Sequence, residues 1–160
     1  MCLGKDEEAC KIGDFGMSRD LISDDYYVSQ GGKVPVRWTA LEALMFNHFS
    51  TASDVWSFGV VLYELWSLGA TPYTSLKPVE VVRSVKNGER LPPPPGCPNW
   101  IYRLMIECWH PVGRKRPRFS TILFLLQQDN DMASFGKLGD SLESTCELFI
   151  DLQTVYMCKA

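Results

Sequence analysis

Residues 50–66 read STASDVWSFGVVLYELW, and this stretch decides the fold. Ser50 and the serine, threonine and aspartate residues after it carry side chains that cap the start of a helix. The apolar residues that follow recur at helical spacing and spread beyond one face. Because a helix that is apolar nearly all round must be covered by other elements, we expect a helix over about 52–68 in the middle of a domain.

Other helices are expected around this one. They span 41–46, 78–87, 99–110 and 119–128. The second begins with Pro78 and stops at Gly88, and we expect Val79, Val82 and Val85 on its inner side.

The stretch 91–96, LPPPPG, cannot be helical because four successive prolines lack backbone donors. It is expected to be an extended connector. Between a packed crossing and a ligand for domains that bind proline-rich segments, we favour the packed crossing.

Upstream, residues 9–12 form a short strand candidate that ends at Gly13-Asp14-Phe15-Gly16, where two glycines indicate a turn. Residues 17–36 show little periodicity and are rich in Asp, Ser, Tyr and Gly. A loop of this length is uncommon in a compact domain unless it is functional or disordered.

Composition and charge narrow the class of protein. The chain has 160 residues, 46% of them hydrophobic and 22% charged, which is typical of a globular domain. The net charge of −3 gives no electrostatic case for binding nucleic acid. Residues 1–126 carry 14 basic and 13 acidic side chains, whereas residues 127–160 carry 2 and 6. We therefore expect a domain over 1–126 and an acidic tail over 127–160 that contains a short helix.

The six cysteines show neither C-x-x-C spacing nor a nearby histidine at zinc-ligand spacing. Reduced, mostly buried thiols are the better interpretation, which indicates the cytosol. The sequence contains no signal peptide and no apolar run long enough to span a membrane.

Several short motifs follow one another in a fixed order. They are KIGDFGMSRD (11–20), DYY (25–27), VPVRW (34–38), SDVWSFG (53–59), CP (97–98), CW (108–109) and RPRF (116–119). Together they resemble the protein-kinase family, and specifically protein-tyrosine kinases of the receptor type, from about residue 2 to residue 122. The resemblance implies a mainly α, protein-kinase-like C-lobe, an incomplete α+β kinase fold with a short strand before the activation segment.

The resemblance also implies an ATP site. Asp14 corresponds to the Mg²⁺ ligand of the family, and Gly13 and Leu3 lie beside the nucleotide. Mg²⁺ prefers hard oxygen ligands and is often held by one or two carboxylates plus phosphate. Taken alone, Asp14-Phe15-Gly16 has a simpler interpretation, which is a polar turn after a strand.

Two further groups of residues acquire roles from the resemblance. Tyr26 and Tyr27 become activation-loop phosphorylation sites, whose phosphates would pair with cations such as Arg19, Lys33 and Arg37. The substrate-peptide platform is made of Pro35, Arg37 and Trp38. Without the resemblance, these would be two surface tyrosines and a plain turn proline.

Glu42 and Arg116 resemble the ion pair that links the end of the activation segment to the late helices. Leu41 stands where the family has proline in A-P-E. Asp54 is expected to be a buried acceptor for backbone N–H groups of the catalytic loop; alternatively it is an acid favoured by the helix dipole.

The 160 residues contain no Gly-rich loop, no strand lysine with its glutamate partner and no H-R-D-x-x-x-x-N catalytic loop. We therefore expect a part of an ATP-dependent tyrosine kinase that is inactive alone and that works with Mg-ATP, tyrosine-containing proteins and an N-terminal lobe. The parent would be a plasma-membrane receptor. The alternative is a truncated, non-catalytic module whose phosphotyrosines are bound by phosphotyrosine-binding domains.

Overall fold

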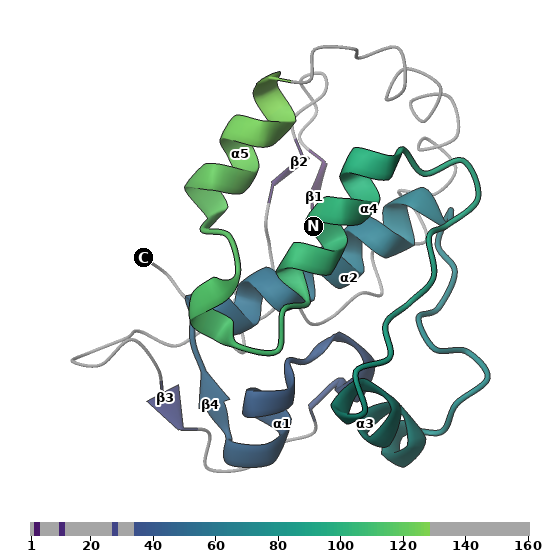
Figure 1. Ribbon diagram of the computed structural model, residues 1–160, viewed down its shortest axis with the longest axis vertical. Coiled ribbons are helices and arrows are strands. Elements are labelled where there is room, and N and C mark those ends of the chain that lie inside the picture. The colour runs from purple at the N-terminus through teal and green to yellow at the C-terminus, as the bar shows by residue number, and fades with distance from the viewer. Residues whose placement is uncertain (1, 4–9, 12–26, 29–33, 129–160) are drawn as a thin grey trace.

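The computed structural model describes residues 2–3, 10–11, 27–28 and 34–128. Its helices are α1 (Leu41–Phe46), α2 (Thr51–Trp66), α3 (Pro78–Lys86), α4 (Asn99–Cys108) and α5 (Phe119–Gln128). Single 3₁₀ turns cover Val36–Trp38 and Gly113–Lys115. Figure 1 shows α2 in the middle of the helical body, with α4 beside it and the other helices around the pair. The mainly α architecture is confirmed.

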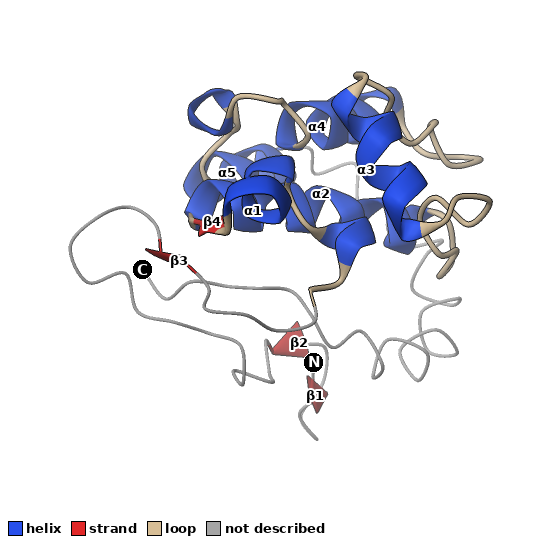
Figure 2. Cartoon of the chain, turned by 90° about the horizontal axis from the view of Figure 1, so that it is seen from below, coloured by secondary structure: helices blue, strands red, loops and turns tan. Residues whose placement is uncertain are grey.

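The strands are two residues long and form two small antiparallel pairs. β1 (Cys2–Leu3) pairs with β2 (Cys10–Lys11), and β3 (Tyr27–Val28) pairs with β4 (His48–Phe49). β2 falls inside the predicted strand 9–12. β3 lies within the predicted loop and β4 was not predicted, because two residues are too few to show the alternation that identifies a strand. Figure 2 shows β1 and β2 set apart from the helices.

The start of α2 is fixed by a reciprocal cap. The Ser53 N–H donates to Ser50 Oγ at 3.3 Å, and the Ser50 N–H donates to Ser53 Oγ at 2.9 Å. At the other end Leu68 takes a left-handed conformation with φ 55°, and the Gly69 N–H returns to the Glu64 carbonyl at 2.8 Å. This closing turn ends the helix two residues earlier than predicted.

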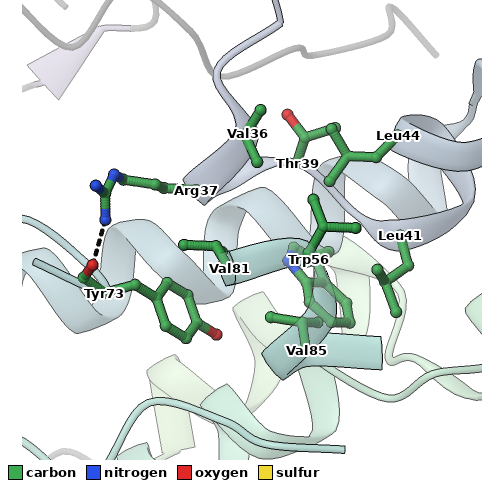
Figure 3. A pocket seen from close by; sticks show the side chains of 10 residues that line it. Val36, Arg37, Thr39, Leu41, Leu44, Trp56, Tyr73, Val81 and Val85 are labelled. Atoms are coloured by element: carbon green, nitrogen blue, oxygen red, sulfur yellow. Dashed lines mark hydrogen bonds between the residues drawn. The ribbon is translucent and has the colours of Figure 1, made fainter. Parts of the chain in front are cut away.

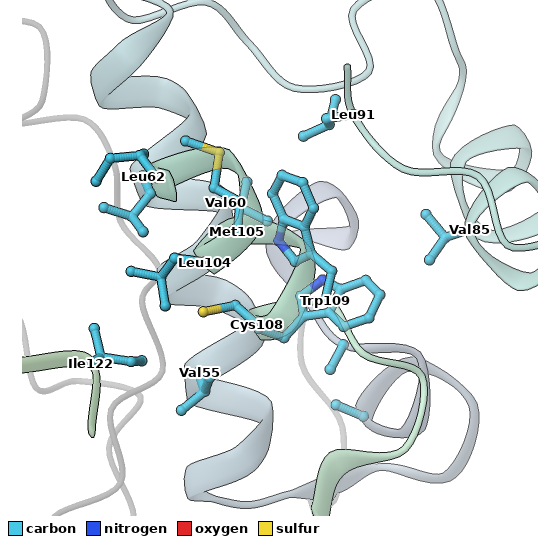
Figure 4. Close-up of a cluster of buried hydrophobic side chains, with 14 of the residues drawn as sticks. Val55, Val60, Leu62, Val85, Leu91, Leu104, Met105, Cys108, Trp109 and Ile122 are labelled. Carbon is cyan, nitrogen blue, oxygen red and sulfur yellow. The ribbon is translucent and has the colours of Figure 1, made fainter. Parts of the chain in front are cut away.

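The core is centred on the contact of α2 with α4 (Figure 4). Gly59 of α2 is required there by space. A Cβ added at Gly59 would lie 2.7 Å from Cys108 Cβ and 2.7 Å from Trp109 Nε1. The missing side chain therefore lets the two helices approach closely. Fully buried side chains surround this point, among them Val55 and Val60 of α2, Ile101 and Met105 of α4, and Trp109 just after α4.

The predicted inner face of α3 is partly wrong. Val81 and Val85 are buried, but Val79 is 73% exposed. Residues three apart drift around a helix of 3.6 residues per turn, whereas residues four apart stay close to one face. The Val81–Val85 pair therefore faces the core and Val79 faces solvent.

Candidate functional site

Residues 35–39 form a tightly hydrogen-bonded turn. The Trp38 N–H donates to the Pro35 carbonyl at 3.1 Å, and Thr39 Oγ1 donates to the same oxygen at 2.9 Å. Pro35 has no N–H, and its φ of −73° is close to the value that its ring imposes. The turn is thus organised around one carbonyl, and the next residue, Ala40, is completely buried.

One face of α2 holds Trp38 at two points. The Trp38 indole Nε1–H donates to Glu64 Oε2 at 2.8 Å, and Ser57 Oγ donates to the Trp38 carbonyl at 2.8 Å. Ser57 and Glu64 are seven residues apart, so they lie on the same side of the helix, two turns apart. The indole and the backbone of Trp38 are therefore both fixed relative to α2.

Glu64 is a carboxyl group placed in an apolar helix. The residue is 3% exposed. Burial raises the pKa of Glu64 from 4.5 to about 7, and the hydrogen bond from Trp38 lowers it in part. Desolvation disfavours the charged form, whereas a donor aimed at the carboxylate favours it. The Trp38 contact thus offsets part of the cost of burying this acid.

Arg37 is directed to the loop that joins α2 and α3. Its Nη1 donates to the Pro72 carbonyl at 2.8 Å and to the Tyr73 carbonyl, and its Nη2 donates to the Leu76 carbonyl at 2.7 Å. Figure 3 shows the Arg37 side chain reaching Tyr73. These contacts tie the turn to the loop, so Arg37 acts as an anchor for residues 35–39.

The turn leaves almost no space beneath it. The cavity in Figure 3 has a volume of about 10 Å³ and is lined by Val36, Thr39, Trp56 and Val81, among others. That is about the space for a single water molecule. The underside of the turn is therefore packed, and a ligand would have to contact its outer side.

A bidentate ion pair connects α1 with the segment before α5. Arg116 Nη1 lies 2.5 Å from Glu42 Oε1, and Nη2 donates to Glu42 Oε2 at 2.9 Å. Arg116 also donates to the carbonyls of Ala52 and His110, each at 2.8 Å. Its side chain is completely buried. Planar guanidinium groups suit this paired geometry with a carboxylate.

Two arginines lie over the indole of Trp56. The Arg90 and Arg116 guanidinium carbons are 5.0 and 5.1 Å from the ring centroid. Both distances are within the range of cation–π attraction. Burial lowers the pKa of Arg90 from its ordinary value. Through its contacts with Glu42, Ala52 and Trp56, Arg116 joins α1 and α2 to the segment before α5.

The sequence matches known proteins over the same residues. A sequence model of the family described as "Protein tyrosine and serine/threonine kinase" matches residues 1–126. The chain belongs to the protein tyrosine and serine/threonine kinase family. The match spans the turn 35–39, the Glu42–Arg116 pair and the central helix, and the predicted kinase-like C-lobe is confirmed.

Several proteins that are similar to this chain carry the names of receptors. Ephrin type-A receptor 8 of rat (Rattus norvegicus) is 49% identical over 120 residues, which cover 74% of this chain and 32% of the relative. Human (Homo sapiens) ephrin type-A receptor 8 is 50% identical over 119 residues, covering 73% and 12%. Zebrafish (Danio rerio) ephrin type-B receptor 4a is 46% identical over 123 residues, covering 74% and 12%. The chain thus spans a third or less of these relatives, and the matches confirm the resemblance to receptor-type tyrosine kinases.

The described residues include only part of the predicted kinase site. Asp14, Gly13 and Tyr26 lie outside the described residues. Leu3 pairs with Cys10 in the first small sheet, and Tyr27 pairs with Phe49 in the second. The ATP and phosphorylation sites therefore stay predictions from the sequence.

The structure brings the remaining predicted residues to α2. Pro35, Arg37 and Trp38 form one turn beside it. Glu42 and Arg116 are in contact, and Asp54 is 1% exposed in the first turn of α2. A favourable interaction with the helix dipole does not require burial, because it also operates on exposed residues. The dipole alone therefore does not explain why Asp54 is buried.

Sequence reasoning missed Glu64, Ser57 and Arg90. A signal for Glu64 was present, since it is the one acid in the apolar stretch 55–66. A charge among apolar residues of a central helix indicates a buried group with a partner. For Ser57 and Arg90 no comparable pattern exists, because their partners are backbone carbonyls of distant residues.

The described residues show neither a metal-ligand cluster nor a membrane-spanning helix. Among residues 34–128 and the three described residue pairs before them, no group of three or more His, Cys, Asp or Glu side chains is placed to hold a metal ion. In that same part of the chain, no helix has the length and apolar character needed to cross a membrane.

Proposed function

We propose that this chain forms the carboxyl-terminal lobe of a receptor-type protein-tyrosine kinase, which transfers the γ-phosphate of ATP to tyrosine in proteins. The observation that carries the proposal is the turn 35–39, which is held to α2 by the Trp38–Glu64 hydrogen bond and to the loop between α2 and α3 by Arg37. The turn is held at three points: the Trp38 indole, the Trp38 carbonyl and the Arg37 guanidinium. Phosphoryl transfer depends mainly on positioning, so a rigid support for the acceptor peptide is useful.

Each platform residue has a distinct task in this proposal. The Pro35 ring offers a flat, half-buried apolar surface against which an acceptor tyrosine ring packs. Trp38 and Arg37 fix the position of the turn that carries Pro35, through the hydrogen bonds to Glu64 and to the Leu76 carbonyl. Glu42 and Arg116 fix the end of the same segment against the late helices.

The nucleotide site belongs to the proposal as a sequence prediction. Asp14 would hold Mg²⁺, with Gly13 and Leu3 near ATP, and the metal would neutralise charge on the phosphates. Tyr26 and Tyr27 would be phosphorylated to order the segment. The parent protein is proposed to be a plasma-membrane receptor with this lobe in the cytosol, because the relatives are named receptors.

A chimera tests the proposal. Residues 1–126 of this chain, the range that the family model matches, would replace the matching segment of rat ephrin type-A receptor 8, to which the chain is 49% identical over 120 residues. We expect the purified chimera to phosphorylate a tyrosine peptide with Mg-ATP, and Pro35→Ala to raise KM for the peptide. The unaltered rat protein and an Asp14→Asn chimera serve as the positive and negative controls.

The chimera also separates the two hypotheses for function. A chimera that melts cooperatively near the temperature of the rat protein but transfers no phosphate contradicts the kinase proposal. It would favour the non-catalytic module, whose phosphotyrosines are bound by phosphotyrosine-binding domains. Turnover that is lost with Asp14→Asn supports the kinase.

A further inference from the structure

The connector between α3 and α4 has a backbone dictated by its prolines. Residues 91–96 read LPPPPG, so each residue from Leu91 to Pro94 precedes a proline. Proline fixes its own φ near −65° and confines the residue before it to extended conformations. The segment is therefore a preformed polyproline II stretch. It ends in a turn in which the Cys97 N–H donates to the Pro94 carbonyl at 3.1 Å and Gly96 has φ 76°.

This stretch has one packed edge and two free edges. A polyproline II helix has three residues per turn, so residues three apart share an edge. Leu91, 4% exposed, and Pro94 are buried, and Tyr102 Oη donates to the Leu91 carbonyl at 3.0 Å. Pro92, Pro93 and Pro95 are exposed. The packed crossing expected from the sequence thus uses only one edge of the segment.

The free edges carry no charge. Residues 91–102 contain no Asp, Glu, Lys or Arg. The neighbouring Arg90 is directed inward, where it donates to the carbonyls of Trp109 and Val85, each at 3.0 Å. Glu89 lies against the Ser84 hydroxyl at 2.5 Å. The ridge itself, residues 91–95, therefore offers a partner no arginine for a charged pocket, and the next arginine along the chain is the exposed Arg103 of α4.

We propose that Pro92, Pro93 and Pro95 form a docking site for a WW-type domain, whose aromatic-lined groove binds polyproline II segments. Binding to a preformed segment has a low ordering cost, because its conformation is already fixed by the fold. Aromatic rings in the groove would stack on the exposed pyrrolidine rings. The uncharged ridge selects this class over grooves that pair a ligand arginine with acidic residues. This site goes beyond the kinase function and does not depend on it.

The test is a titration of the 160-residue chain with a panel of purified WW domains. We expect saturable binding by at least one domain, measured by calorimetry, and at least tenfold weaker binding by Pro92→Ala/Pro93→Ala. Pro111→Ala is the matched control, since Pro111 is also exposed but lies outside the ridge. Thermal melting of each variant shows whether the fold is retained. A synthetic peptide of residues 88–99 tests the same sequence without the fold.

Any of the following results would overturn the proposal. The first is that no WW domain of the panel binds the chain, or that the double variant binds as tightly as the unaltered chain. The second is that the chain binds SH3 domains and not WW domains. The third is that the peptide binds a WW domain while the folded chain does not, because the packed edge would then block access.

Discussion

Arg116 and Glu42 are 74 positions apart in the chain and form two parallel hydrogen bonds, at 2.5 and 2.9 Å. The pair lies where α1, the start of α2 and the segment before α5 meet, because Arg116 also binds the carbonyls of Ala52 and His110. One side chain, that of Arg116, thus connects three segments that belong to different elements of the fold.

Arg116→Ala is expected to lower the free energy of unfolding by roughly 3–5 kcal/mol, since it leaves buried oxygens without their donor. Glu42→Gln should cost about 1–2 kcal/mol, because the amide oxygen still accepts one hydrogen bond and Glu42 is 27% exposed. Urea unfolding measures both. Arg114→Ala, at an exposed arginine two positions earlier, should stay within about 0.5 kcal/mol. A similarly small effect of Arg116→Ala would contradict a stabilising role.

The Glu64 pKa makes stability depend on pH. The pKa is about 7 in the fold against 4.5 ordinarily, so the folded protein binds this proton more tightly than the unfolded chain does. The contribution to stability is therefore fully present below pH 4.5 and is lost as the pH rises through about 7. We expect the urea midpoint to fall between about pH 5 and about pH 8.

Glu64→Gln provides the comparison for this pH effect. Glutamine keeps an oxygen that accepts the Trp38 indole hydrogen bond but does not titrate in this range. The midpoint of the variant should fall less than that of the unaltered chain over the same pH interval. An identical pH profile for the two proteins would show that Glu64 is not the group responsible.

Gly59→Ala should destabilise the fold by about 1–3 kcal/mol, because the new methyl group would overlap Cys108 and Trp109. At an exposed helical site the same change would stabilise the helix by about 1 kcal/mol. The sign of the measured change in thermal unfolding therefore decides whether α2 and α4 approach as closely as described. Thr121→Ala, at an exposed position of α5, is the control for the effect of an alanine substitution outside the contact between α2 and α4.

Trp38→Phe should weaken use of the peptide substrate by the chimera. Phenylalanine has no indole N–H, so Glu64 loses its donor and the turn loses one of its attachments to α2. We expect KM for the tyrosine peptide to rise several-fold while KM for ATP stays unchanged. A parallel rise in both constants would indicate general unfolding of the lobe.

The 160 residues by themselves should not transfer phosphate. Their sequence contains no Gly-rich loop, no strand lysine with its glutamate and no catalytic-loop base, and these groups position ATP and accept the tyrosyl proton. Incubation with Mg-ATP, a tyrosine peptide and a sensitive phosphate assay checks this. Turnover above that of an Asp14→Asn variant would refute the expectation.

The helices could be predicted from the sequence because their signals are local. The bounds of α1 and α5 agree with the predicted ranges, and the cap at Ser50 and the stop at Gly88 depend on neighbouring residues. The order of motifs also identified the family, since many residues in fixed spacing are jointly specific. The two-residue strands and the exposed Val79 could not be predicted, because pairing partners and the facing of α3 depend on distant segments.

By itself, the sequence determined where helices start and stop, that the connector 91–96 is extended, and that the chain resembles a kinase. Only the tertiary structure decided that Glu64 receives the Trp38 indole, that Arg37 binds the loop at 72–76, and that three prolines of the connector remain exposed. The physical reason is range. Capping, proline geometry and helical periodicity act within a few residues, whereas burial and side-chain partners are set by which distant surfaces meet when the chain folds.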